Sequence, residues 1–290
     1  MLNNYAPILD SCEPFVIAHR GFSPSLPKQL RGMSIPDANV IDPQLREHAD
    51  FLGLLRHLDT LCFGPNGMPM PSWVFYDCAV MPGGFFGLAI RAARLEPWCL
   101  EAMQVPAGYT GLVPVSQLIA IPMLAGFAAS ATPDTWLVYS LESINQVSPG
   151  FAPAGLQKLT LALGLQLFPI RTLYGTTQWR AHKLATYVDL GPLELVTAYT
   201  PAHSLPRTLS FRIDLQDVHL ETLLAGPNVH AIAQAPNGWI DPDDADALMA
   251  LQAEIEAGAC IQLVGRPQYY GAQIRIPIHR VGAPKPLEAR

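Results

Sequence analysis

Apolar residues follow helical spacing in three long stretches of the chain. The first, Leu45–Leu61, comes after Asp42, a good N-cap, and after a proline suited to the first helical position. The second, Leu156–Leu167, predicts a largely buried helix. The third, Trp179–Asp189, predicts a helix that ends at Gly191, which a proline follows.

Runs of β-branched and aromatic residues between turn residues predict the strands. Trp73–Val80 and Phe85–Arg94 are separated by the turn residues 81–84, which indicates a hairpin. Leu112–Val115 and Leu118–Pro122 are predicted as two buried strands joined by a turn. The other predicted strands are Trp136–Val147, which is unusually long, Ile170–Gly175, Leu193–Tyr199, Thr208–Leu215, Ala259–Val264 and Ala272–Ile278.

Three parts of the chain are predicted to have different roles. Residues 1–41 contain five prolines, too many for a helix longer than two turns, and are expected to form an irregular arm that wraps the main domain. Residues 42–200 contain the predicted core, and residues 201–290 a C-terminal α/β extension or small second domain. In this extension a helix is predicted directly after Asp241, because carboxylates in a first turn complement the helix dipole.

The charge and the cysteine content exclude several function classes. A net charge of −6, a pI near 5.7 and thinly spread lysines and arginines leave no basic surface for nucleic acid. The five cysteines are widely spaced and form no CxxC, which predicts reduced thiols in a cytoplasmic protein. The first twenty residues show no basic segment followed by an apolar run, so no secretory signal is predicted.

The spacing of residues predicts neither a local metal motif nor a membrane span, and any metal site would have to be assembled from distant segments. The eight histidines show no HxH, HxxxH or HExxH pattern, so no local metal motif is present. The stretch Ala102–Pro133 is uncharged, but Pro106, Pro114 and Pro122 interrupt it. We therefore predict buried strands here and no membrane span.

The long strand and the residues after it carry a family resemblance. Val147-Ser148-Pro149 is followed by Gly155-Leu156, where a loop becomes a helix that contains Thr160. Together with the order helix, hairpin, long strand, loop, helix, strand, helix, strand, this resembles the GNAT acyltransferase superfamily over about half the chain. The resemblance implies an α+β fold with a mixed, largely antiparallel central sheet flanked by helices. It also implies that backbone amides at the helix N-terminus hold the pyrophosphate of acetyl-CoA or a longer acyl-CoA.

The glycine loop departs from the family pattern Q/R-x-x-G-x-G/A. With Gly155 aligned to the first glycine, Ala152 stands at the Q/R position and Gln157 at the last small position. A full side chain where backbone and ligand meet closely can block the phosphates. This loop therefore has two interpretations, a functional cofactor site and a degenerate one.

Two residues are candidates for catalysis. Tyr187 stands four residues before Gly191, as does the family tyrosine that protonates the leaving thiolate, while Arg180 and Lys183 depart from the family's N-x-x-A. Glu142, in the otherwise uncharged long strand, is the candidate general base, because burial of a carboxyl group raises its pKa. Two alternatives stay open: Tyr187 packs at the end of its helix, and Glu142 is exposed at a sheet edge or forms a salt bridge.

The sequence supports two functions. The first is acyl-CoA-dependent N-acyl transfer to a small amine or related acceptor. In this function the residues expected to bind the cofactor are Val147, Gly155, Leu156 and Thr160. The second is a non-catalytic binding or assembly protein that has lost the cofactor and forms a homodimer through its apolar surface. We also predict an apolar pocket lined partly by Leu118, Ile119, Ile121 and Met123, the alternative being that these four residues only fill the core.

Overall fold

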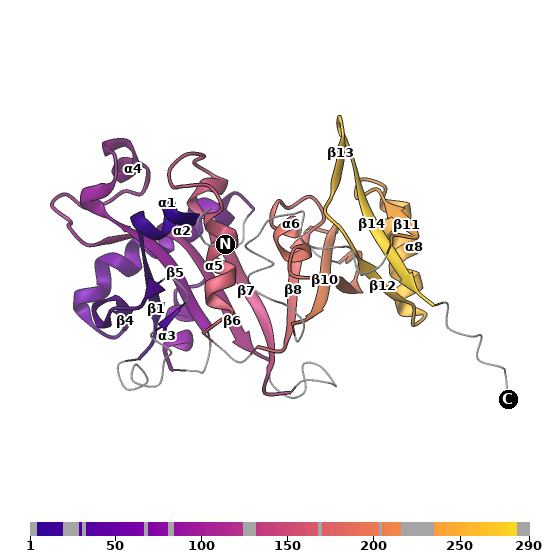
Figure 1. The fold of residues 1–290 in the computed structure, drawn as a ribbon, viewed down its shortest axis with the longest axis horizontal. Helices are drawn as coiled ribbons and strands as arrows, with labels where there is room; N and C mark the ends of the chain where they lie inside the picture. Colours follow the sequence, from indigo (N-terminus) through magenta and orange to yellow (C-terminus); the bar gives the residue numbers. More distant parts are fainter. Residues whose placement is uncertain are drawn as a thin grey trace. The chain divides into compact units, whose positions relative to one another are not determined.

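The computed structural model describes residues 5–19, 29–30, 33–66, 69–80, 84–123, 132–167, 170–202, 205–215 and 235–282. The chain divides into two compact units. One contains residues 1–133 and 138–169, and the other contains residues 134–137 and 170–290. Each unit contains both β-strands and α-helices (Figure 1).

The first unit contains a mixed, largely antiparallel sheet. Its strands lie in the order β7-β6-β5-β1-β4. β5 pairs antiparallel with both β1 and β6, and β4 pairs parallel with β1. Their bounds are β1 Cys12–Ile17, β4 Val40–Ile41, β5 Gly84–Arg91, β6 Leu112–Pro122 and β7 Thr135–Ser143, and a separate small pair consists of β2 Gln29–Leu30 and β3 Met33–Ser34. The predicted fold class is therefore confirmed.

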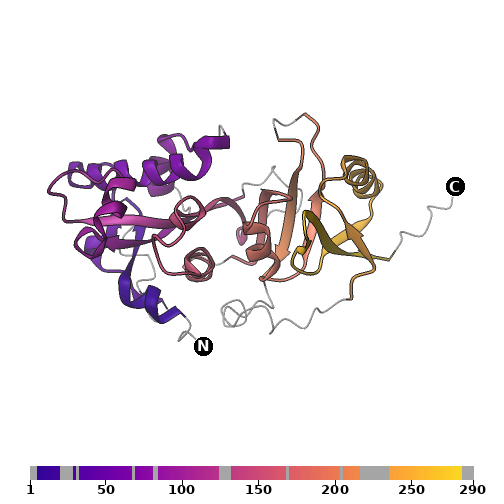
Figure 2. The same ribbon diagram turned by 90° about the horizontal axis from the view of Figure 1, so that it is seen from above.

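Helices cover both faces of this sheet (Figures 1 and 2). Phe85, from β5, packs in a core cluster with residues of α2 and α3, whereas its neighbour Phe86 lies close to Gly164 of α5 on the opposite face. The helices of the unit are α1 Ala6–Ser11, α2 Ala49–Phe63, α3 Trp73–Val80, α4 Pro97–Ala102 and α5 Leu156–Gly164.

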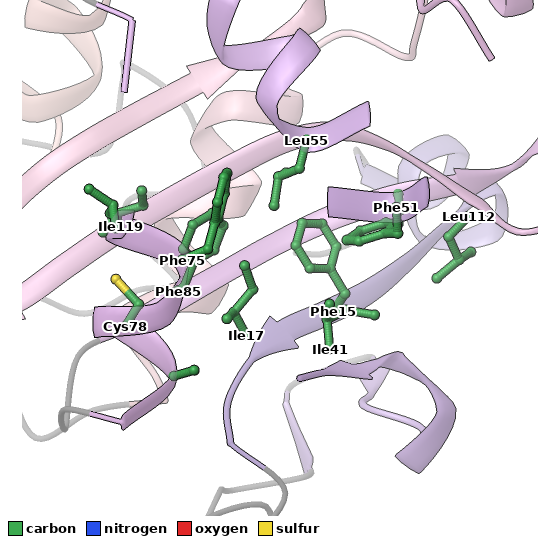
Figure 3. Packing of buried hydrophobic residues seen from close by; sticks show 13 residues of the cluster. Phe15, Ile17, Ile41, Phe51, Leu55, Phe75, Cys78, Phe85, Leu112 and Ile119 are labelled. Carbon is green, nitrogen blue, oxygen red and sulfur yellow. The ribbon is translucent and has the colours of Figure 1, made fainter. Parts of the chain in front are cut away.

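The core of the first unit lies under α2 and α3 (Figure 3). Phe15 makes an edge-to-face contact with Phe51 at 4.9 Å between ring centroids, and Phe75 lies 5.7 Å from Phe85. Ile119, from β6, is wholly buried in the same cluster. This layer holds the helices against the strands that lead to the candidate site.

Several predicted elements of the first unit are corrected. Trp73–Val80 is a helix, because its buried residues Val74, Phe75, Cys78 and Ala79 follow helical spacing; the turn at 81–83 lies outside the described residues. The two strands expected between residues 112 and 122 are one strand, since Pro114 sits beside a bulge in the pairing with β5.

Element boundaries differ from the predictions at three other places. The helix expected after Asp42 begins at Ala49, because the Asp42 side chain accepts a hydrogen bond from the Gln44 amide in a local turn. The long strand ends at Ser143 and continues as a short 3-10 turn. The expected irregular arm contains α1 and β1, and β1 belongs to the sheet.

The second unit contains an antiparallel run of strands. β8 and the neighbouring β10, β9, β12, β14 and β11 lie in that order, and β13 pairs with β14. The bounds are β8 Thr172–Gln178, β9 Leu193–Thr197, β10 Thr208–Asp214, β11 Gly238–Ile240, β12 Cys260–Leu263, β13 Gln268–Tyr270 and β14 Gln273–Val281. Two helices accompany them, α6 Lys183–Val188 and α8 Ala245–Glu256. α8 begins three residues later than predicted, because the Asp244 side chain caps it by accepting from the Ala247 amide.

Candidate functional site

The loop between β7 and α5 is held in shape by one asparagine. Asn145 donates from its side-chain nitrogen to the carbonyls of Ala152 and Pro153, at 2.8 and 3.2 Å, and its side-chain oxygen accepts from the Ala152 amide at 3.0 Å. The amides of Val147 and Ser148 both donate to the carbonyl of Ile144. The loop is thus a closed turn that ends beside the first residues of α5.

The N-terminus of α5 is the part of this loop that could bind an anion. A helix leaves its first amides without a partner of its own, and those of Leu156 and Gln157 stand in these positions. Gly155, the N-cap, is exposed and has φ +88°, a left-handed conformation that favours glycine. Lys158 stands in the first turn, where a cation opposes the helix dipole but complements a bound phosphate.

Aromatic side chains from other segments cover the loop. A side chain at Gly155 would place its Cβ 2.9 Å from Cε1 of Tyr5, so the Tyr5 ring lies directly against this glycine. Trp98, from α4, makes an edge-to-face contact with Phe151 at 5.6 Å between ring centroids. The Tyr5 ring is buried, and it limits the approach of any ligand to Gly155.

Glu142 lies in β7, next to the loop, and is wholly buried. Ser140 and Ser143, at the same end of β7, are also buried. Buried polar side chains are uncommon in proteins, and the end of β7 contains three of them. Glu142, Val147, Gly155 and Leu156 all belong to the first unit. Val147 is partly exposed, whereas Leu156 is buried.

Thr160 is placed differently from a cofactor ligand. Its hydroxyl donates to the Leu156 carbonyl at 2.8 Å and shares a hydrogen bond with the Ser116 hydroxyl at 2.5 Å. Both hydroxyl groups are wholly buried between α5 and β6. These contacts fasten α5 to the sheet, and the predicted cofactor contact of Thr160 stays a prediction.

Tyr187 lies in the second unit, on α6. Its ring packs against Phe211 of β10, with 4.9 Å between centroids, and burial raises the pKa of its hydroxyl far above the usual range. The hydroxyl therefore keeps its proton at any ordinary pH. A raised pKa also makes the hydroxyl a weaker proton donor, so the role of Tyr187 as general acid stays a prediction.

The predicted apolar pocket is not supported by the positions of its residues. A side chain on Gly164 of α5 would meet Leu118 at 2.5 Å, whereas the next residue, Ile119, belongs to the cluster under α2 and α3. Successive residues of a strand face opposite sides of a sheet, so the two cannot line one pocket. Leu118 and Ile119 fill the core, which was the alternative.

From the long strand onward the order of elements is the one that the resemblance implied, whereas the first strand of the predicted hairpin is the helix α3. Two helices, α2 and α3, precede β5, β6 and β7; α5 then leads to β8, and α6 to β9. The Asp134 carbonyl accepts from the amides of Arg171 and Thr172, so β7 and β8 start at the same end and run parallel. From β7 onward this arrangement resembles that of the GNAT superfamily.

Comparison with known proteins gives matches to solved structures only. No family model and no curated protein matches the chain. The chain is similar to the ribosomal-protein-S18-alanine N-acetyltransferase from Escherichia coli, with 14% identity and a TM-score of 0.36 over 58% of this chain and 92% of that one. It is similar to Arabidopsis thaliana NAA60, solved with a bisubstrate analogue, with 10% identity and a TM-score of 0.37 over 56% and 92% of the two chains. It is also similar to FeeM, an N-acyl amino acid synthase from uncultured soil microbes, with 13% identity and a TM-score of 0.34 over 61% of this chain and 89% of that one.

The described residues also bear on metal and membrane sites. Among those residues, no group of three His, Cys, Asp or Glu side chains is arranged to hold a metal ion. Among them, too, no helix has the length and apolar character needed to cross a membrane. Sequence reasoning missed Asn145 and Tyr5, since neither the bond to Ala152 nor the contact with Gly155 has a local sequence signature.

Proposed function

We propose that this protein is an acyl-CoA-dependent N-acyltransferase that acts on a small amine. The observation that supports this most is the loop of residues 147–155, which leads from a buried carboxylate on β7 to an exposed glycine and the first amides of α5. The amides of Leu156 and Gln157, with Lys158 beside them, would hold the pyrophosphate of the acyl-CoA.

The proposed reaction is direct transfer of the acyl group. The acceptor ammonium loses a proton to Glu142, the free amine nitrogen attacks the thioester carbonyl carbon, and the carbon–sulfur bond breaks as the amide forms. The thiolate that leaves takes up a proton, the step for which the family resemblance implied Tyr187. No covalent acyl-enzyme is needed.

Calorimetric titration with acetyl-CoA and with longer acyl-CoAs tests the binding step. We expect saturable binding at or below millimolar concentration, and no heat from any acyl-CoA would contradict the proposal. Glu142→Gln tests the chemical step, since it retains the shape of the side chain. We expect acyl-CoA affinity to stay the same and kcat to fall by about 10²-fold or more, with part of the rate restored at high pH, where the acceptor amine is already deprotonated.

A second function, binding or assembly without catalysis, is favoured by one specific contact. The Tyr5 ring lies against Gly155, and the Ala152 amide is engaged by Asn145, so two positions of the loop are occupied by the protein itself. Failure of acyl-CoA binding, together with self-association in sedimentation experiments, would select this function. Measurable acyl transfer by a monomer would exclude it.

A further inference from the structure

An exposed tryptophan of the first unit lies against the loop of residues 147–155. Trp98, on α4, has 48% of its surface exposed. Its ring contacts that of Phe151, with 5.6 Å between the centroids and 78° between the planes. Phe151 belongs to the loop and is buried. A solvent-exposed aromatic ring therefore stands directly beside the loop that leads to the first amides of α5.

The ring of Trp98 is held in place from two sides. The first is α4 itself, which begins at Pro97 and whose Cys99 and Met103 are buried, so the helix is anchored to the unit. The second is the ring contact with Phe151. An aromatic side chain that is already fixed loses little conformational freedom when a ligand packs on it, which favours binding.

The connection that carries α4 is also tied to the other segment at the start of α5. Arg94 donates a hydrogen bond to the Asp10 carbonyl of α1 at 3.1 Å. α1 has only six residues, about 9 Å of helix, and Tyr5, its N-cap, lies against Gly155. The α4 connection, α1 and the loop of residues 147–155 are therefore joined by printed contacts within one unit.

The spacing along the loop suits an adenine nucleotide. Phe151 precedes Gly155 by four residues, which span at most about 14 Å even in a fully extended chain. In an acyl-CoA a single ribose joins the adenine to the pyrophosphate. Two rings in edge-to-face contact meet with the edge of one against the face of the other, so Phe151 covers at most one face of Trp98. A pyrophosphate at the α5 amides thus leaves the adenine within reach of an aromatic face.

We propose that Trp98 stacks on the adenine ring of the acyl-CoA and thereby selects CoA thioesters as acyl donors. The competing donor is a thioester on 4′-phosphopantetheine alone, the arm that an acyl carrier protein presents, which has no adenine to stack. Stacking of a base on an aromatic side chain needs no hydrogen bond, because every base has a π-face. The inference rests on the proposed function and names its donor class.

Three probes and three variants test this by calorimetry. The probes are acetyl-CoA, S-acetyl-4′-phosphopantetheine, which lacks the nucleotide, and adenosine 3′,5′-bisphosphate, which lacks the acyl arm. The variants are Trp98→Ala, Trp98→Phe, which keeps a smaller ring, and Trp73→Ala as the matched control. Trp73, on α3, is exposed to a similar degree, at 58%.

We expect Trp98→Ala to weaken acetyl-CoA and adenosine 3′,5′-bisphosphate by at least about fivefold, the lower end of the measured effect of base stacking. The affinity for S-acetyl-4′-phosphopantetheine should not change. Trp98→Phe should lose less affinity than Trp98→Ala, because part of the stacking surface remains. Trp73→Ala should bind all three probes as the wild type does.

Two results would overturn the inference while leaving the proposed function in place. One is acetyl-CoA binding that Trp98→Ala does not weaken. The other is an equal loss for acetyl-CoA and S-acetyl-4′-phosphopantetheine, because Trp98 would then act only by packing on Phe151 and shaping the loop. Absence of acetyl-CoA binding by the wild type would overturn the proposed function and the inference together.

Discussion

Replacing Gly155 by alanine tests whether the Tyr5 ring fixes the start of α5. The substitution has two costs in the structure. The φ of +88° places an L-residue in the left-handed region, which costs about 1–2 kcal/mol. The new Cβ also lies 2.9 Å from Cε1 of Tyr5, and overpacking a buried contact costs about 1–3 kcal/mol. We therefore expect the free energy of unfolding to fall by about 2–5 kcal/mol.

Gly150 provides the control for the backbone part of this cost. It has φ +85°, and a Cβ there would meet no heavy atom within 4 Å. Gly150→Ala should therefore cost only about 1–2 kcal/mol. The excess at Gly155 should vanish when Gly155→Ala is made in a Tyr5→Ala background, because the contact is then absent.

Urea unfolding monitored by circular dichroism gives all the free energies required. Equal costs at Gly150 and Gly155 would refute the packing argument, as would an excess that persists without Tyr5. Acyl-CoA titration of Tyr5→Ala adds a functional measurement. Tighter binding than in the wild type would show that the ring limits access to the α5 N-terminus.

Three further predictions concern single contacts. Thr160→Val should reduce the free energy of unfolding by about 1–3 kcal/mol, because it leaves the buried Ser116 hydroxyl unpaired; adding Ser116→Ala should restore much of the loss in the same urea assay. The hydrogen bond from Arg91 lowers the pKa of Glu13 from its ordinary 4.5, so its stabilisation is complete above that pH and is lost as the pH falls through the lowered value; Glu13→Gln should flatten this part of the stability profile between pH 7 and 3. Tyr187→Phe should retain the fold, since the ring contact is unchanged, and should reduce kcat without changing the acyl-CoA dissociation constant; an unchanged kcat would remove the tyrosine from the mechanism.

Regular periodicity made some elements predictable from the sequence. The predicted helix at 156–167 is confirmed as α5, because its apolar residues pack on both β5 and β6. The strand near residue 208 is confirmed as β10, whose Leu209, Phe211 and Ile213 alternate with polar residues. In both elements the apolar positions of the local sequence pattern are the positions that face the core.

Elements with conflicting signals were not predictable. In α3 the aromatic and β-branched residues favour a strand, but burial of Val74, Phe75, Cys78 and Ala79 selects the helix. In β6 the proline at 114 indicates a break, but a bulge accommodates it within one strand. Tertiary packing decided both cases, and packing partners distant in the sequence leave no local pattern.

The candidate site was predictable to the extent that it depends on residues adjacent in the chain. The loop after Val147 and the glycine before α5 follow from the sequence. The contact of Tyr5 with Gly155 joins residues far apart in the chain. Such properties arise only when the chain is folded.

The departure of the loop from the family pattern has a structural reason. Pro149 and Pro153 have no amide to donate, so the loop lacks two of the backbone groups that usually stabilise a turn. Asn145 compensates, because its single side chain bonds the Ala152 amide and two carbonyls. Asn145 thus holds the loop in shape, and in the proposed function the amides that remain for a phosphate are those of the first turn of α5. Asn145→Ala should for this reason disorder the loop and weaken acyl-CoA binding together.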